Sequence, residues 1–293
     1  MALHPQLAAL LQKGPVLTDG AWGTELQKRG LAPGQPPEAW NLTRPDEVLA
    51  VGRAYVEAGS RVLLTNTFGA NRIRLAEAGL ADQVQLLNRL GVELSRQAAG
   101  AGVAVFASIG PTGKLLVAGE VTPEQVRAAF EEQATALAEA GADGLVVETM
   151  TNLEEARLAL SAAKSTGLPV VVCMVFDSGR ARDRTLMGET PETVARALEA
   201  AGADVLGANC GQGIEGFVDL CRRFRAVTSL PLWMKPNAGL PEWVDGRPYY
   251  TTSPEAFAAH APELRAAGAD FLGGCCGTNP EFIRALGRAL GLS

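Results

Sequence analysis

The chain has 293 residues, of which 47% are hydrophobic and 20% are charged, as is usual for a folded soluble protein. Its net charge of -6, without a basic stripe, argues against a nucleic-acid partner. No apolar run approaches the roughly 18 residues that a membrane span needs. The N-terminus lacks the basic and apolar regions of a secretory signal, and an odd number of cysteines suits a reducing compartment. We therefore expect a cytoplasmic protein.

One pattern recurs along the chain, in which an Ala/Glu/Arg-rich helical stretch ends at glycine and a short β-rich run follows. Ala140-Gly141-Ala142-Asp143, Ala201-Gly202-Ala203-Asp204 and Ala267-Gly268-Ala269-Asp270 are three copies of this junction. Glycine in such a position adopts the left-handed conformation that ends a helix. The predicted strands are 16–19, 62–67, 103–109, 144–149, 169–176, 205–210, 230–236 and 271–275.

Helix starts between these strands carry a clear signal. Thr122, Thr190, Ser253 and Asn279 each precede a proline, which is the pattern of a capping side chain followed by proline in the first helical position. Eight strand–helix units in 293 residues predict an α/β protein with one (β/α)8 TIM-barrel domain over residues 1–293. The same alternation permits an open doubly wound sheet, but the even spacing and the count of eight favour the barrel.

Three long or Pro/Gly-rich segments follow strands 1, 5 and 7, at 34–37, 177–190 and 236–248. In a barrel, such segments lie at the C-terminal face, where active sites are found. The last leads into Tyr249-Tyr250 and is expected to cover part of the barrel mouth. The segment 177–190 is rich in charged residues, so a solvated surface loop explains it as well as a role in the site.

Three cysteines fall at the ends of predicted strands. Cys210 ends strand 6, and Cys275 and Cys276 end strand 8, with glycines on both sides of the pair. Adjacent strand residues point to opposite faces, so the backbone must leave the strand there, and glycine permits this. Three thiolates around one ion suggest zinc with a fourth position open for substrate. A buried structural cysteine is the alternative, and we assign Cys173 and Cys221 to that class.

The predicted chemistry follows from the charge of such a centre. Three thiolates and Zn²⁺ sum to -1, which suits the binding of an incoming thiol better than the activation of water. Coordination deprotonates that thiol at neutral pH and leaves its sulfur electron-rich. The centre therefore suits alkyl transfer to sulfur, with the substrate thiolate as nucleophile. No general base is needed, so no catalytic residue beyond the metal site is predicted, and the chain has only His4 and His260.

Polar residues at other strand ends would complete the site. Asp19 and Glu148 end strands 1 and 4, where their carboxylates would face a substrate ammonium group. An isolated Asp-Gly pair is usually a turn, whereas Glu148 follows a buried apolar run and would be costly there without a partner. Thr67, at the end of strand 2, offers polar groups for a carboxylate, and Asn237, at the end of strand 7, offers an amide oxygen.

These residues lie in stretches that resemble the homocysteine S-methyltransferase family, which includes betaine-homocysteine methyltransferase and the homocysteine domain of cobalamin-dependent methionine synthase. The resembling stretches span nearly the whole chain. They are Asp19-Gly20-Ala21-Trp22-Gly23-Thr24, Thr65-Asn66-Thr67-Phe68, Ser108-Ile109-Gly110-Pro111-Thr112-Gly113, Gly207-Ala208-Asn209-Cys210, Pro236-Asn237-Ala238-Gly239-Leu240-Pro241 and Gly273-Gly274-Cys275-Cys276-Gly277-Thr278.

The resemblance implies a (β/α)8 barrel in which Cys210, Cys275 and Cys276 bind zinc. It also implies that Asp19 and Glu148 receive the amino group of homocysteine. We further hypothesise that Asn237 occupies the fourth position on zinc when substrate is absent. The carboxylate of homocysteine would meet the backbone around Gly20, Ala21 and Thr67.

The length of the chain leaves the methyl donor open. Cobalamin-dependent methionine synthase carries folate, cobalamin and reactivation modules, none of which fits into 293 residues. Yet 110–113 and 237–241 look more like that enzyme's homocysteine domain than like the enzymes that use betaine or S-methylmethionine. The preferred expectation is therefore methionine biosynthesis with methylcobalamin or methyltetrahydrofolate as donor, through a corrinoid protein.

Three arrangements would account for the short chain. It would be an excised domain, a subunit that takes methyl from a separate corrinoid protein, or a standalone enzyme that uses S-methylmethionine or betaine. Two further classes of protein stay open, namely a barrel hydrolase whose rim acids do the catalysis, and a non-enzymatic zinc- or thiol-binding barrel. Zinc content separates the first of these from a methyltransferase, and methyl transfer separates the second.

Overall fold

Eight parallel strands form one sheet in the computed structural model, which describes residues 3–244 and 247–292. The strand order is β1-β10-β7-β6-β5-β4-β3-β2, and a parallel bridge between Thr18 and Val62 joins the two ends of the sheet. The sheet is thus a closed (β/α)8 barrel, and the alternative of an open sheet is wrong. The strands are β1 (Val16–Leu17), β2 (Val62–Leu64), β3 (Ala104–Ile109), β4 (Gly144–Met150), β5 (Val170–Met174), β6 (Val205–Gly213), β7 (Leu232–Asn237) and β10 (Phe271–Leu272).

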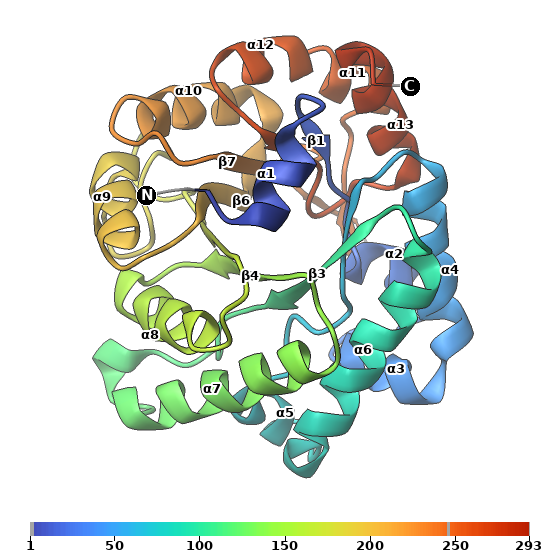
Figure 1. Cartoon of the computed structure of the whole chain (residues 1–293), viewed down its shortest axis with the longest axis vertical. Coiled ribbons are helices and arrows are strands. Elements are labelled where there is room, and N and C mark those ends of the chain that lie inside the picture. Colours follow the sequence, from blue (N-terminus) through green and yellow to red (C-terminus); the bar gives the residue numbers. More distant parts are fainter. Residues whose placement is uncertain (1–2, 245–246, 293) are drawn as a thin grey trace.

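Helices between the strands cover the outside of the barrel (Figure 1). Four predicted caps are confirmed, since the side chains of Thr122, Thr190, Ser253 and Asn279 accept hydrogen bonds from the first turns of their helices. Among the described residues, no helix is both long and apolar enough to cross a bilayer. The helices are α2 (Gly23–Lys28), α3 (Trp40–Thr43), α4 (Pro45–Glu57), α5 (Arg72–Ala76), α6 (Val84–Ala99), α7 (Pro123–Glu139), α8 (Leu153–Lys164), α9 (Pro191–Ala200), α10 (Ile214–Arg225), α11 (Pro254–Ala258), α12 (Ala261–Ala266) and α13 (Pro280–Leu290), with 3-10 turns at Pro37–Ala39, Ala81–Gln83 and Leu116–Ala118.

The barrel interior is filled by side chains that alternate along each strand with those of the outer core. Trp233 of β7 stacks between Phe106 of β3 and Phe271 of β10, with ring centroids 6.2 and 5.0 Å apart. Helix α1 (Pro5–Leu11), which the sequence pattern did not predict, lies across the centre of the ring of strands (Figure 1). Its Leu7 packs with the inner cluster and closes that end of the barrel.

Both cysteines assigned to the core are buried. Cys173 lies in the inner cluster, and Cys221 lies among the residues between the barrel and its helices. This confirms that neither belongs to the polar end of the barrel. Every cysteine in the described residues is a free thiol.

Strand ends differ from the prediction where polar residues begin. Strands 1, 2 and 8 end earlier than expected, at Leu17, Leu64 and Leu272. Strand β6 instead continues to Gly213 through a register shift after Asn209. The segment after β7 forms an unpredicted antiparallel hairpin of β8 (Glu242–Val244) and β9 (Arg247–Tyr249).

Candidate metal and substrate site

The three cysteines at the strand ends converge. The sulfur atoms of Cys210, Cys275 and Cys276 all lie within 4.8 Å of one another, and Cys210 Sγ is 3.9 Å from Cys276 Sγ. They come from β6 and from the segment after β10, with β7 between these two strands in the barrel. In a tetrahedral site with Zn–S bonds near 2.3 Å, the sulfurs are about 3.8 Å apart. The spacing observed here therefore fits a zinc ion without a large rearrangement.

Backbone conformation explains how the cysteines reach one point. Cys210 has φ = 62°, a left-handed conformation that is rare outside glycine. It lies within the register shift of β6, which turns its side chain away from the regular alternation. Cys275 follows the end of β10, and its amide donates to Pro236 O at 2.7 Å, while Cys276 O accepts from the Ala238 amide at 3.0 Å. The segment that carries Cys275 and Cys276 is therefore fixed by the end of β7.

Electrostatics at the cluster favour a cation. A hydrogen bond with Cys275 works to lower the pKa of Cys210, but the Cys276 sulfur and burial outweigh it and raise that pKa to about 12. The contact with Cys210 is the main cause that raises the pKa of Cys275. Three half-buried thiols this close resist losing their protons together, because each thiolate repels the next. A divalent soft ion between them would offset that repulsion.

One buried amide oxygen near the cluster has no hydrogen-bond partner among the described residues. It is Oδ1 of Asn237, the last residue of β7. A buried polar atom without a partner is unusual and calls for a ligand or an ion. The next residue, Ala238, donates its amide to Cys276 O, so Asn237 lies beside the cysteine segment. Its position is compatible with a fourth ligand.

A polar layer lies between the cysteines and the aromatic interior of the barrel. On β3, β4 and β7 its members follow interior residues at two-residue spacing, as Ser108 follows Phe106 and Lys235 follows Trp233. The layer consists of Asp19, Ser108, Glu148, Asn209 and Lys235.

Asp19 is fully buried, and its carboxylate already has several donors. Oδ2 accepts from Trp22 Nε1 and from the Leu64 amide, each at 2.8 Å. Oδ1 forms an ion pair with the ammonium of Lys235. Burial works to lower the pKa of Lys235, but the carboxylates of Asp19 and Glu148 outweigh it and raise that pKa. Asp19 therefore lies at the predicted place with a cation already beside it.

Glu148 has fewer partners. Its Oε1 accepts from Ser108 Oγ at 2.5 Å, and its Oε2 has a long contact of 3.4 Å with Asn209 Nδ2. Burial raises the pKa of Glu148, against the opposing effect of Lys235. Asn209 Nδ2 also lies 3.7 Å from Cys275 Sγ, which connects this carboxylate to the cysteine cluster. Glu148 is thus next to the cluster with acceptor positions to spare.

The residues predicted to meet a carboxylate lie at the ends of β1 and β2. A Cβ on Gly20 would come within 2.8 Å of both Thr278 Oγ1 and the Tyr55 hydroxyl, so only glycine fits there. Ala21 is held on both sides, since its amide donates to Thr278 Oγ1 at 3.2 Å and its carbonyl accepts from Tyr55 at 2.7 Å. Thr67 is buried and donates its hydroxyl to Ser108 O at 2.7 Å. Whether these groups bind a carboxylate stays a prediction.

Tyr250, after the β8–β9 hairpin, lies over the cysteine segment. A Cβ on Gly277 would be 2.3 Å from its ring, so the ring packs directly on that glycine. Burial, followed by the nearby Cys276 and Cys210 sulfurs, raises the pKa of the Tyr250 hydroxyl. Tyr250 thus covers part of the cysteine segment, whereas residues 245 and 246 of the segment expected to cover the mouth lie outside the described residues.

The segment 177–190 is fastened to neighbouring elements. Asp183 is paired with Arg223 of α10 at 2.6 Å, and Arg182 O accepts from Gln212 Nε2 at 3.2 Å. Gln212 is two residues after Cys210, so the segment touches the chain that carries this sulfur.

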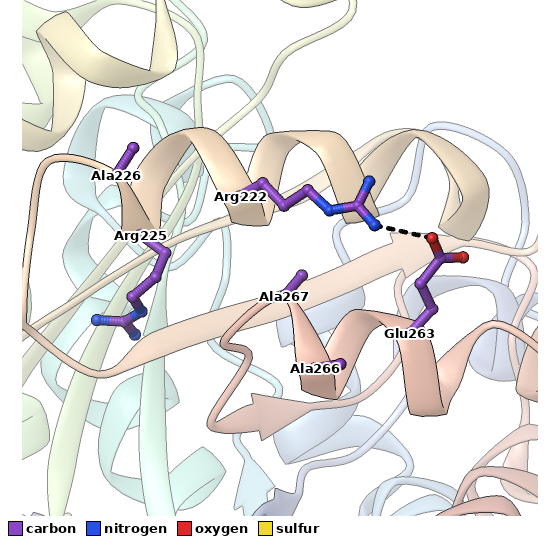
Figure 2. Close-up of a pocket in the computed structure, with 6 residues that line it drawn as sticks. All are labelled: Arg222, Arg225, Ala226, Glu263, Ala266 and Ala267. Atoms are coloured by element: carbon purple, nitrogen blue, oxygen red, sulfur yellow. Dashed lines mark hydrogen bonds and ion pairs between the residues drawn. The ribbon is translucent and has the colours of Figure 1, made fainter.

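A separate groove between α10 and α12 does not contribute to this site. Figure 2 shows Arg222 and Glu263 facing each other across it, with an ion pair of 2.9 Å. Its other lining residues lie at or just after the ends of these helices, before β7 and β10 begin. That is the opposite end of the barrel from the cysteines.

Known proteins resemble this chain over nearly its whole length. Residues 16–290 match the family model described as homocysteine S-methyltransferase. The chain belongs to the homocysteine S-methyltransferase family. Membership places it among methyltransferases and confirms the resemblance seen in the sequence.

Relatives of this chain include larger enzymes and one of similar size. Methionine synthases of Mycobacterium leprae (strain TN) and Mycobacterium tuberculosis (strain ATCC 25618 / H37Rv) are each 30% identical over 97% of this chain. The chain spans only about a quarter (25%) of their length. The metallated form of the homocysteine methyltransferase MmuM from Escherichia coli has a TM-score of 0.80 at 26% identity, over 97% of this chain and 99% of that one.

Sequence reasoning missed Lys235 and the supporting Ser108 and Asn209. A signal for Lys235 was available, because a lysine inside a strand between Trp233 and Asn237 occupies an inward position. Such a residue is almost never buried without a partner of opposite charge. Applying that rule would have pointed to Asp19 or Glu148 as its partner.

Proposed function

We propose that this chain is a zinc-dependent homocysteine S-methyltransferase that forms methionine. The observation that carries the proposal is the convergence of three cysteine sulfurs within 4.8 Å. The neighbouring strand end adds Asn237, whose buried amide oxygen has no hydrogen-bond partner among the described residues. Cys210, Cys275 and Cys276 would hold the zinc, and Asn237 Oδ1 would be its fourth ligand without substrate. Zinc bound there would keep the sulfur of homocysteine as a thiolate at neutral pH. Free thiols are essential to this site, which supports a location in the reducing cytoplasm.

The residues around the cluster would place the amino-acid part of homocysteine. Glu148 and the more deeply buried Asp19 give this end of the barrel negative charge, which favours a substrate ammonium. The backbone around Gly20, Ala21 and Thr67 would receive the carboxylate. The protein then needs to hold the sulfur of homocysteine, orient its carbon skeleton and exclude water. Tyr250, whose ring packs on Gly277, would exclude water.

For the methyl donor, we favour a corrinoid protein that carries methylcobalamin charged by methyltetrahydrofolate. The relatives named methionine synthase are four times as long as the matched region, which leaves room in them for further domains. Large apolar side chains are also exposed on segments that follow strands, and a protein partner would cover such side chains at the mouth. They are Leu42, Leu115, Val117, Leu186, Met187, Leu240 and Tyr249.

A second candidate is a standalone enzyme that takes methyl from S-methylmethionine or betaine. The E. coli homocysteine methyltransferase has nearly the same length as this chain and a similar structure throughout, which favours a small donor.

A donor panel tests the proposal. Methionine formation from homocysteine is measured with methylcobalamin, S-methylmethionine and betaine in parallel, and zinc is quantified in the same sample. We expect one zinc per chain and turnover with methylcobalamin. Cys210→Ser should lose both zinc and turnover, whereas Cys221→Ala, a buried cysteine outside the cluster, should keep both. Turnover with S-methylmethionine or betaine alone would replace the preferred donor, and a zinc-free active sample would refute the metal site.

A further inference from the structure

Two strands beside the cysteine cluster each contain a residue in the left-handed region, and neither residue is glycine. Thr149 of β4 has φ = 61° and Cys210 of β6 has φ = 62°. Each lies at a register shift, that of β4 against β5 and that of β6 against β7. Because threonine is branched at Cβ, this backbone conformation is a genuine outlier for it and persists only where neighbouring groups hold it in place.

The side chain of Asn209, the residue before Cys210, holds Thr149 at two points. Its Oδ1 accepts from the Thr149 amide at 2.7 Å, and its Nδ2 donates to Thr149 Oγ1 at 2.8 Å. Strands β4 and β6 are not neighbours in the sheet, because β5 lies between them. The side chain therefore ties together two strands that the sheet itself does not pair, at the left-handed residue of each.

These two contacts fix the way the Asn209 amide faces. Only an acceptor can receive the backbone N–H of Thr149, so Oδ1 must lie there and Nδ2 on the other side. Nδ2 carries two hydrogens, and Thr149 Oγ1 takes one of them. The second hydrogen has two longer contacts, 3.4 Å from Nδ2 to Glu148 Oε2 and 3.7 Å from Nδ2 to Cys275 Sγ. Asn209 is 0% exposed, so bulk water does not compete for this hydrogen.

A metal in the cluster would strengthen the contact between Asn209 and sulfur. A coordinated cysteine is a thiolate, and hydrogen bonds to an ionised acceptor are shorter and stronger than those to a neutral one. A donor to Cys275 would take up part of the excess negative charge that three thiolates leave on a zinc centre. The centre would then attract the thiolate of a substrate more strongly.

We propose that Asn209 is a positioning residue with two roles. Its side chain keeps Thr149 in the left-handed conformation, and its second N–H donates to the Cys275 sulfur when a metal is bound. The first role fixes the backbone of β4 next to the cluster, and the second adjusts the electron density on the metal's sulfur ligands. The second role rests on the proposed metal site and function, whereas the first needs no ligand.

Cobalt(II) is the probe for the second role, because it takes tetrahedral sulfur sites as zinc does and its sulfur-to-metal charge-transfer band reports the electron density on the thiolates. Asn209→Ala should move this band to longer wavelength, since a thiolate without its hydrogen bond gives up an electron more readily. The variant should also bind zinc about 10- to 100-fold more weakly in a titration against a chelating dye.

Asn152→Ala is the matched control. Asn152 also follows β4, and its side chain accepts from the amides of Glu154 and Glu155 at the start of α8, away from the cysteines. This variant loses two hydrogen bonds, as Asn209→Ala does, but should keep the wild-type cobalt band and zinc affinity. A band that moves equally in both variants would overturn the contact between Asn209 and sulfur.

Thr149→Gly separates the two roles. Glycine takes the left-handed conformation without strain and has no hydroxyl, so Asn209 has less to hold in this background. In urea unfolding with chelator, Asn209→Ala should lower the midpoint less in Thr149→Gly protein than in wild-type protein, while the shift of the cobalt band stays the same. An equal loss of midpoint in both backgrounds would overturn the first role. A cobalt band that Asn209→Ala leaves in place would overturn the second.

A crystal structure of the wild type with zinc decides both roles if Asn209→Ala does not fold. We expect Asn209 Oδ1 on the Thr149 amide and Nδ2 within hydrogen-bond reach of Cys275 Sγ, and an amide turned away from either would refute the inference. A wild type that binds cobalt but methylates homocysteine with no donor would end the proposed reaction, and the band comparison would still decide the role of Asn209. A wild type that binds no cobalt would overturn the second role together with the metal site.

Discussion

Replacing Cys210 by glycine and by alanine separates the strain at this residue from its role as a ligand. Its φ of 62° costs a non-glycine residue about 1–2 kcal/mol relative to the ordinary helical region. Glycine avoids that cost but loses about 0.5–1 kcal/mol through its greater freedom in the unfolded chain. In metal-free buffer, Cys210→Gly should therefore be about 0.5–1 kcal/mol more stable than Cys210→Ala.

Zinc should stabilise the wild type over both variants. A ligand at a hundred times its dissociation constant stabilises the folded state by about 2.7 kcal/mol. The wild type should gain an amount of that order when zinc replaces a chelator, whereas both variants, with two sulfurs left, should gain little. Cys221→Ala, which keeps the cluster, should respond to zinc as the wild type does.

Urea unfolding followed by circular dichroism, with chelator and with zinc, measures both effects. Equal stabilisation of the wild type and the two Cys210 variants by zinc would refute the three-sulfur site. A Cys210→Gly variant less stable than Cys210→Ala in chelator would show that the left-handed backbone is not the source of strain.

Three further changes test other parts of the molecule. Asn237→Ala removes the amide oxygen that has no hydrogen-bond partner among the described residues. Titration against a chelating dye should show that this variant binds zinc more weakly, and that the loss of affinity is larger without homocysteine than with it. An equal loss of affinity in both conditions would argue against a fourth ligand at Asn237. Gly20→Ala forces a Cβ within 2.8 Å of the Tyr55 hydroxyl and should cost about 1–3 kcal/mol in urea unfolding, so an unchanged midpoint would contradict the close packing. A hydrogen bond from Arg223 lowers the pKa of Glu192 from 4.5 to about 2, against the opposing effect of burial. Because the Glu192 side chain is 31% exposed and solvent screens the pair, Glu192→Gln should lower the free energy of unfolding by about 1 kcal/mol at neutral pH. That stabilisation is complete above pH 4.5 and disappears as the pH falls toward 2, so a difference in unfolding free energy that grows on acidification would refute it.

The barrel was predictable because its signals are local and repeated. A helix that ends at glycine, a β-rich run and a new capping residue recur along the chain, and each junction is decided by neighbouring residues. Helix α1 was missed although His4 caps it and Pro5 begins it, because histidine is not among the usual capping residues and the helix has only seven residues. Its Leu7 is buried by contact with the inner barrel residues. The β8–β9 hairpin was missed because its residues read as a Pro/Gly-rich loop.

The sequence was enough to predict which cysteines form the cluster, but not how their backbone brings the sulfur atoms together. Two glycine-flanked cysteine segments at strand ends indicated convergence, but no local pattern indicates the left-handed conformation of Cys210 or the register shift between β6 and β7. The same holds for Lys235. Its inward position follows from strand periodicity, whereas its choice of Asp19 over Glu148 as partner depends on distances across the barrel that no local pattern contains.

X-ray absorption at the zinc edge, recorded with and without homocysteine, tests the central claim most directly. We predict three sulfur ligands and one light atom in the free protein, and four sulfur ligands once homocysteine is added. A spectrum with fewer than three sulfurs, or one that homocysteine leaves unchanged, would contradict the account.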